Sequence, residues 1–297
     1  MKKTTISLIF ALSCLFLFFP SDTFAHELSI QIEEDTASEE LRVDVIWGHI
    51  RDFVDYAEVD EFELHVRYPS GEMEELALEA IGVQGRAYVP AAEEGDYTFW
   101  AVKQPSTYTP DGGVTQLSSH MAKAVYPVGS GSDTSGQPVE LELEIVPAVS
   151  INDFSTGTFS GTVLFTENEA ADATVTAYGP EGEVLETVSS SEGTFDFELD
   201  TTGEWLIKAH LPEEEAGTLE GEDYEAISRN TTLLVDTTTE ETENTTTEQT
   251  EGAAAEETEN SETQVPSLVA MLVVGLLVGA TATLFVLKKK GSQENRD

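Results

Sequence analysis

Between residues 26 and 236, apolar and polar residues alternate in short runs, the pattern typical of half-buried β-strands. The first two runs have their apolar residues at Leu28, Ile30 and Ile32, and at Leu41, Val43, Val45 and Trp47. Further runs follow, separated by turn residues, and none of them keeps a 3.6-residue apolar period over several turns. The pattern predicts an all-β fold built of sandwiches rather than a closed barrel.

A Gly- and Ser-rich break at 129–137, GSGSDTSGQ, interrupts the strand pattern, which changes after Pro147. A β region of about 210 residues suits two sandwiches of about 100 residues better than one domain. We therefore expect an N-terminal β-sandwich at 26–146 and a C-terminal Ig-like or prealbumin-like β-sandwich at 147–236.

The first 25 residues have the layout of a secretory signal peptide. Lys2 and Lys3 precede an apolar run at 6–19, and Ala25 supplies the small residue that signal peptidase requires. Cleavage after Ala25 would make His26 the first residue of the mature chain. The sole cysteine, Cys14, would be removed, which leaves no disulfide and no thiolate metal ligand.

The other end predicts an anchored protein. Residues 265–287 form an uncharged apolar segment of the length that a bilayer-spanning helix needs, and three lysines at 288–290 mark its cytoplasmic end. The Thr- and Glu-rich segment 237–264 predicts a disordered acidic stalk. We expect a single-pass cell-membrane protein with an extracellular body and a cytoplasmic tail at 288–297.

The formal net charge of -43 excludes whole classes of partner. Nucleic acid and anionic membrane surfaces would be repelled by such a chain. Solubility in a salty or alkaline environment explains the charge most simply. An acidic body also raises the local concentration of cations, which suits a metal-binding protein without requiring one.

Strand parity brings two histidines together. His26 and His49 each continue the inward parity of their run. If the runs form an antiparallel hairpin, parity allows Leu28 to pair with Val43, Val45 or Trp47. The register that pairs Leu28 with Trp47, Ile30 with Val45 and Ile32 with Val43 places His26 opposite His49. Opposed Cβ atoms lie about 5 Å apart, close enough for two imidazoles to share a metal ion. The pairing would be lost if the two strands belonged to different sheets.

A mature N-terminal histidine offers two ligands, its α-amino nitrogen and its Nδ1 atom. The amine has an ordinary pKa of roughly 7.7–8.0, so a divalent cation displaces its proton near neutral pH. An amine with two or three imidazoles suits Ni(II) or Cu(II), and Zn(II) less exclusively. The alternative is that signal cleavage leaves an arbitrary residue first.

The other histidines are weaker candidates. His120 lies in a polar stretch at the start of an expected strand, where it either completes a three-histidine set or is a surface residue. His210 lies on the polar parity of a later strand, and His65 shares an expected solvated face with Glu63 and Arg67, so His65 is not expected to bind metal. The candidate metal ligands are His26, His49, His120 and His210.

The stretches AHELSIQ, VDVIWGH, GDYTFWAV, SSHMAKAVY and GEWLIKAHLPEE resemble a bacterial family of secreted domains, long of unknown function and grouped with nickel-uptake components. Its members often begin with a histidine and carry Gly-His after the second strand, as Gly48-His49 does here. The resemblance covers about 26–236, and it implies an extracytoplasmic accessory protein that binds nickel or a similar ion and passes it to a membrane transporter. Ser29 departs from the family, in which an aromatic residue often follows the first histidine, and the stalk and anchor are not part of the shared domain.

Three functions remain open. The first is a membrane-tethered binding protein for Ni(II), with Cu(II) or Zn(II) as alternatives, in a metal uptake system. The second is a cell-surface adhesion or structural protein with Ig-like modules on a stalk. The third is a copper enzyme that uses the N-terminal histidine. No nucleophile elbow, phosphate-binding glycine loop or HExxH motif is present, so the sequence predicts a protein that is not an enzyme.

Overall fold

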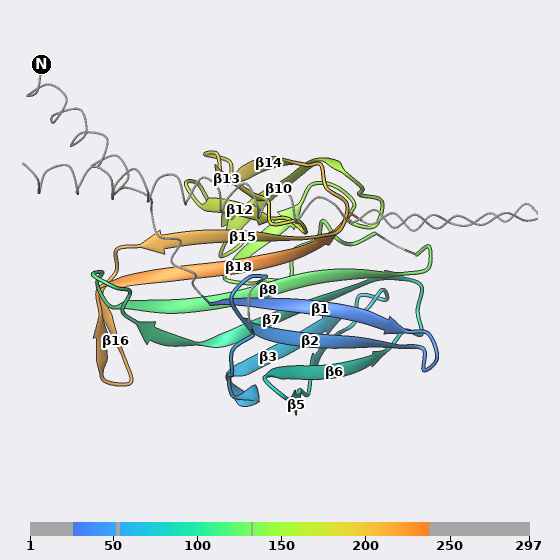
Figure 1. Ribbon diagram of the computed structural model, residues 1–297, viewed down its shortest axis with the longest axis horizontal. Helices are drawn as coiled ribbons and strands as arrows, with labels where there is room; N and C mark the ends of the chain where they lie inside the picture. Colours follow the sequence, from blue (N-terminus) through green and yellow to red (C-terminus); the bar gives the residue numbers. More distant parts are fainter. Residues whose placement is uncertain (1–25, 52–53, 132, 238–297) are drawn as a thin grey trace, which may run out of the picture. The chain divides into compact units, whose positions relative to one another are not determined.

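The alternating runs form β-strands throughout the part of the chain that the computed structural model describes, residues 26–51, 54–131 and 133–237 (Figure 1). The predicted all-β class, with sandwich-like packing of sheets, is confirmed. A short 3-10 helix, η1 (Val59–Glu61), precedes β3. Within the described ranges no helix has the length and apolar character needed to cross a bilayer. The expected signal peptide, transmembrane segment and tail, and all but the first residue of the expected stalk, lie outside the described residues.

An eight-stranded sheet forms the centre of the fold. Its strand order is β13 (Val184–Val188), β12 (Thr174–Tyr178), β15 (Glu204–Glu213), β18 (Ala226–Asp236), β8 (Gln116–Val128), β7 (Gly95–Tyr108), β3 (Phe62–Arg67) and β4 (Met73–Leu76). The pairing of β18 with β8 is parallel, and the others are antiparallel. This pairing joins strands from both expected modules in one sheet. The module boundary expected at residues 146 and 147 stays a prediction.

Two smaller sheets complete the layers. The first contains β1 (Glu27–Asp35), β2 (Glu40–Gly48), β6 (Gln84–Pro90) and β5 (Glu79–Ile81). The second contains β11 (Asn168–Glu169), β10 (Gly157–Phe165) and β14 (Thr194–Leu199), with β9 (Leu143–Pro147) also paired to β10. A separate hairpin consists of β16 (Gly217–Leu219) and β17 (Glu222–Tyr224).

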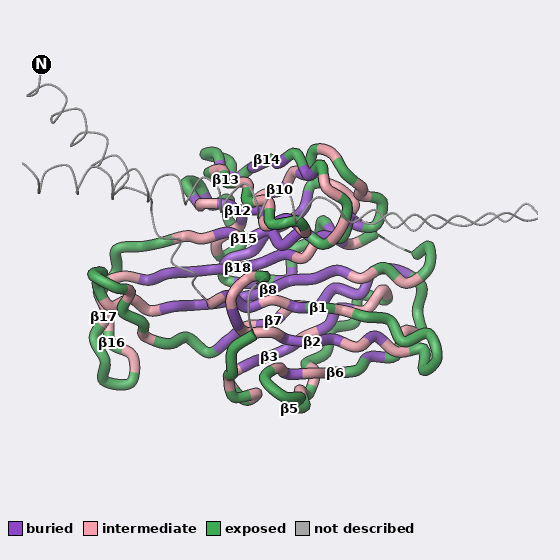
Figure 2. Tube along the Cα trace, in the orientation of Figure 1, coloured by how far each residue is buried: buried purple, intermediate pink, exposed green. Residues whose placement is uncertain are grey.

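The two hydrophobic cores lie on opposite faces of the central sheet. Along β8, Met121 and Val125 belong to the core with β9, β10 and β14, whereas Ala122 and Ala124 belong to the core with β1, β2 and β6. Successive residues of a strand point to opposite faces, so both faces of β8 are covered here. Figure 2 shows the resulting continuous burial along β8 and β18. Their sequence therefore lacks the clean alternation of the outer strands.

The register of β1 and β2 is one of those that parity allows, and it is the one that places His26 opposite His49. Leu28 pairs with Trp47, Ile30 with Val45 and Ile32 with Val43. The even positions of β1 are apolar because they enter the core against the central sheet. This register brings the residue before β1, His26, level with the residue after β2, His49.

The expectation that His65, Glu63 and Arg67 share a solvated strand face is wrong for Arg67. The Arg67 side chain is buried, and its guanidinium donates hydrogen bonds to the carbonyl oxygens of Thr134 (3.1 Å) and Pro138 (3.0 Å). The connection that follows β8 crosses this end of the sheet and covers the strand face. His65 is half-buried, with its ring stacked on Trp100 at 5.3 Å.

Candidate functional site

His26 and His49 lie side by side at one end of the β1–β2 hairpin. Their ring centroids are 4.7 Å apart and the ring planes are inclined by 73°. Both residues are half-buried. The hairpin register therefore brings together two imidazoles that are far apart in sequence, as parity predicted, whereas their role as metal ligands stays a prediction.

Asp55 adds a carboxylate to this pair. After β2 the chain turns back, so that Val54 bridges to Gly48 and the Asp55 N–H donates to the Trp47 carbonyl at 2.8 Å. The Asp55 Oδ2 atom then lies 2.8 Å from His26 Nε2. Hydrogen bonds from the Tyr56 N–H and from His26 hold the Asp55 pKa below its ordinary value. An ionised carboxylate only accepts, so Nε2 of His26 carries the proton.

Trp47 contacts two of the candidate ligands. Its ring stacks on His26 at 5.4 Å and meets His120 of β8 edge-on at 4.7 Å. The indole therefore connects the His26–His49 pair to the central sheet.

Among the residues that the structure describes, no group of three or more His, Cys, Asp and Glu side chains forms a metal-binding cluster. The four candidate histidines therefore do not form one ready-made set of side-chain ligands in this part of the chain.

His120 faces a buried carboxylate. Glu27, the first residue of β1, is 3% exposed, and its Oε1 atom accepts a hydrogen bond from the ammonium of Lys208. Its Oε2 atom lies 3.7 Å from His120 Nδ1. Both of these facing atoms are buried without a hydrogen-bond partner. The contact therefore joins β1 of the small sheet to β8 of the central sheet.

His210 lies in the same row of the central sheet. It pairs with Asn230, which in turn pairs with His120, so the three residues occupy one level of β15, β18 and β8. Burial, followed by the neighbouring charge of Lys208, lowers the His210 pKa, and its Nε2 atom lies 3.2 Å from Ser228 Oγ. His210 is therefore a neutral imidazole at neutral pH.

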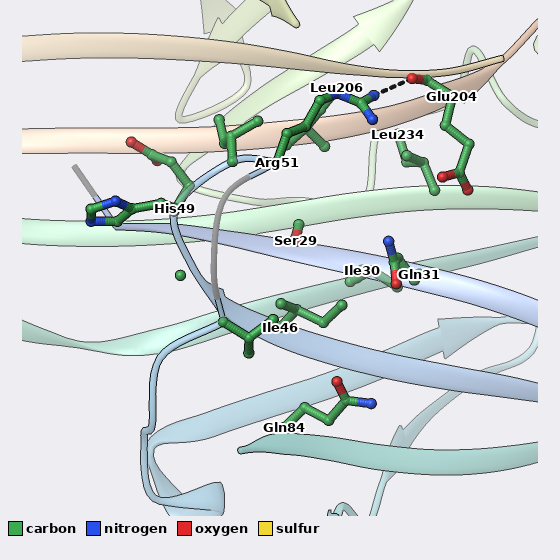
Figure 3. A pocket seen from close by; sticks show the side chains of 14 residues that line it. Ser29, Ile30, Gln31, Ile46, His49, Arg51, Gln84, Glu204, Leu206 and Leu234 are labelled. Atoms are coloured by element: carbon green, nitrogen blue, oxygen red, sulfur yellow. Dashed lines mark hydrogen bonds between the residues drawn. The ribbon is translucent and has the colours of Figure 1, made fainter. Parts of the chain in front are cut away.

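A cavity of about 540 Å³ lies over this row. Its lining includes His26, Trp47, His120, Lys208, His210 and Asn230. A second hollow, of about 300 Å³, borders His49 (Figure 3). Arg51 lies further along that hollow and hydrogen-bonds to the Glu204 carbonyl. His26 therefore lines the larger hollow and His49 lines the smaller one.

Three residues were not predicted from the sequence to belong to the site: Glu27, Trp47 and Asp55. The two carboxylates are hidden among 57 Asp and Glu residues, so sequence alone offers no reason to choose them. Trp47 was predicted only as an inward residue of the second strand. Its contact with His120 depends on how the β1–β2 sheet lies over β8, which strand periodicity does not report.

The chain was compared with solved structures. A two-domain fibronectin type III segment of chicken tenascin matches with 14% identity over 69% of this chain and 98% of that chain, at a TM-score of 0.21. A biofilm-associated protein BSP domain matches with 12% identity over 76% of this chain and 54% of that chain, at a TM-score of 0.19. A Ca2+-stabilized adhesin that helps an Antarctic bacterium bind ice matches with 15% identity over 71% of this chain and 49% of that chain, at a TM-score of 0.20.

The search of curated proteins found no match. A family model does match, over residues 23–213. That range includes His26, His49, His120 and His210, and it reaches across both expected modules. The chain therefore belongs to the DUF4198 family, described as a domain of unknown function.

Proposed function

We propose that the mature protein is a membrane-anchored, extracytoplasmic binding protein for a transition-metal ion, which serves a metal uptake system. The observation that supports this most directly is the contact of the His26 and His49 rings, 4.7 Å between centroids, at the end of the β1–β2 hairpin. Two imidazoles at this separation can bind one metal ion.

The third donor in this proposal is the α-amino nitrogen of His26. Signal cleavage after Ala25 converts the amide nitrogen of His26 into an amine, which can chelate a metal ion together with Nδ1 of the same residue. The hydrogen bond to Asp55 engages Nε2, so the metal-binding role falls to Nδ1. A carboxylate on the second ring nitrogen is the usual partner of a metal-binding histidine, because it fixes the ring and raises its basicity.

The donor set favours a borderline metal. Amine and imidazole nitrogens suit Ni(II) and Cu(II), and also Zn(II), whereas Ca²⁺ and Mg²⁺ prefer oxygen ligands. Nickel is our first choice, which rests on the resemblance to domains grouped with nickel uptake. The acidic body would concentrate any divalent cation near the site.

The anchor and stalk define the cellular role in this proposal. A transmembrane helix at 265–287 and an acidic stalk at 237–264 would hold the β-domains close to the outer face of the membrane. A metal ion bound there could pass to a membrane transporter component, which is the expected protein partner. Tethering keeps the local concentration of the binding protein high beside that transporter.

Calorimetric titration of the β-domains tests the proposal. The protein, residues 26–237, is produced with His26 as its true first residue and titrated with Ni(II), Cu(II) and Zn(II). A matched form carries one additional glycine before His26, which moves the amine away while every side chain stays in place. We expect strong binding by the first form and much weaker binding by the second.

Two results would contradict the proposal in different ways. Equal, strong binding by both forms would show a site that does not use the amine. Weak or absent binding by both forms would reject metal binding altogether. The adhesion or structural function would then be the better explanation of the β-domains on their stalk.

A further inference from the structure

Glu27 and His120 form a buried contact that the amine-based site does not use. Glu27 is 3% exposed and His120 is 8% exposed, and their Oε2 and Nδ1 atoms face each other at 3.7 Å. Neither atom has a hydrogen-bond partner. Burying unpartnered polar atoms is costly, so the contact calls for an explanation beyond packing.

The charge of Glu27 decides which nitrogen of His120 bears the hydrogen. Glu27 forms an ion pair with Lys208, whose ammonium donates to Oε1. At 3.7 Å the contact is longer than a hydrogen bond, yet the carboxylate still attracts an N–H and repels a lone pair. The Nδ1–H tautomer of His120 is therefore favoured over the Nε2–H tautomer.

The other ring nitrogen then points its lone pair into the cavity. The His120 ring lines the cavity of about 540 Å³, and Nδ1 is its buried nitrogen, so Nε2 is the nitrogen that faces the open space. Trp47 meets the ring edge-on at 4.7 Å and limits its rotation. His26, which stacks on Trp47 at 5.4 Å, lines the same cavity.

We propose that Glu27 is a positioning residue that holds His120 as its Nδ1–H tautomer and so presents the Nε2 lone pair to the cavity as a donor for the transition-metal ion. This inference rests on the proposed metal-binding function and deepens it. It assigns His120 to the metal and gives a role to a carboxylate that sequence did not single out. The arrangement is a carboxylate–imidazole–metal relay, in which the outer group sets the tautomer of the ligand.

If the Glu27–Lys208 ion pair served stability alone, it would require no particular tautomer of His120. The test is therefore spectroscopic. Long-range ¹H–¹⁵N correlation spectra of the metal-free mature protein, recorded about two pH units above the ordinary histidine pKa of ~6.5, report the tautomer of each neutral imidazole. We expect His120 to be Nδ1–H in the wild type.

The Glu27→Gln variant should reverse this tautomer. The Lys208 ammonium would still donate a hydrogen bond to the side-chain carbonyl oxygen of the new glutamine. The NH2 group of that glutamine would then face His120. Nδ1 then becomes an acceptor and Nε2 carries the hydrogen. The control is Glu33→Gln, which neutralises an exposed carboxylate that is paired with Arg42 at the far end of β1, so its His120 tautomer should match the wild type.

Metal affinity gives the second readout. Glu27→Gln should weaken binding about 10–100-fold, the usual effect of losing the outer partner of a metal-binding histidine. His120→Gln should weaken binding at least as much, and the double variant should lose no more than His120→Gln alone, because Glu27 acts through His120. Glu33→Gln should bind as the wild type does.

The outcomes separate this inference from the function on which it rests. Absence of binding by the mature wild type overturns both. Binding by the wild type overturns only the role of Glu27 if wild-type His120 is Nε2–H, if Glu27→Gln leaves the tautomer unchanged, or if that variant binds with wild-type affinity. The wild-type tautomer and the His120→Gln titration need no Glu27 variant, so they decide the matter even if Glu27→Gln fails to fold.

Discussion

The Nε2 atom of His26 lies 2.8 Å from Oδ2 of Asp55, a residue that the chain reaches only after turning back beyond β2. This contact fixes the ring of the residue that we expect to be first in the mature protein. It also leaves the chelating role to the nitrogen nearest the main chain. The hydrogen bond is therefore the structural basis for the first prediction.

Replacing Asp55 with Asn should weaken metal binding by the mature protein about 10–100-fold, because the carboxylate orients the imidazole and raises its basicity. Calorimetric titration with Ni(II) measures the change. Asp60→Asn is the matched control, since Asp60 is an exposed carboxylate in η1. Equal losses in both variants would point to a general effect of charge and would contradict a specific role for Asp55.

Replacing His49 with Gln should lower metal affinity by at least about tenfold, which corresponds to 1.4 kcal/mol of binding free energy. The variant removes one imidazole and leaves the His26 chelate. His65→Gln provides the comparison, because His65 stacks on Trp100 in a different part of the central sheet. If His49→Gln binds as tightly as His65→Gln does, the two-histidine site is refuted.

Lys123 and Glu144 form a buried ion pair of 2.7 Å between the central sheet and β9, and each is 1% exposed. Glu144→Gln should lower the free energy of unfolding by about 3–5 kcal/mol, because it leaves a buried ammonium without its counter-charge. Urea unfolding followed by fluorescence measures the loss. The Lys123→Met/Glu144→Leu double variant should lose much less, and a loss equal to that of Glu144→Gln would contradict this account.

Asp96 should make stability depend on pH in the acidic range. Burial raises its pKa above the ordinary 3.8, although Asn152 and the Thr134 N–H donate hydrogen bonds to its carboxylate. The folded state therefore holds the proton more tightly than the unfolded state does. The stability from protonated Asp96 is fully present below pH 3.8 and is lost as pH rises through the folded pKa.

The Asp96→Asn variant should lack this dependence. Its free energy of unfolding, compared with the wild type at each pH, should improve steadily as pH rises from 3.8 through the raised pKa. Urea unfolding series at several pH values measure the difference between the two proteins. A difference that stays constant across that range would show that Asp96 has the same pKa in the folded and unfolded states.

Much of the candidate site follows from period-two reasoning. Side chains of a strand alternate strictly between two faces, so the apolar residues of β1 and β2 restricted the hairpin to a few registers. One of those registers places His26 opposite His49, and this is the register found in the structure. Local sequence neither chose among those registers nor showed whether the two strands pair.

The buried polar row of the central sheet could not be derived in this way. His120 and Asn230 lie in stretches that look polar and exposed, yet they are 8% and 6% exposed. Their burial arises because β18, late in the chain, inserts beside β8 in parallel and a second sheet covers both. Arg67 was misassigned for a related reason, since a distant connection covers its strand face.

The sequence by itself determined the all-β class and limited the β1–β2 hairpin to a few registers, one of which pairs His26 with His49, because both depend on the spacing of apolar residues along neighbouring strands. Only the tertiary structure decided which carboxylates matter. Glu27 and Asp55 are two of 57 acidic residues, and they acquire a role when folding brings them to His120 and His26. Contacts between residues distant in sequence depend on how the sheets pack, and strand periodicity carries no information about that packing.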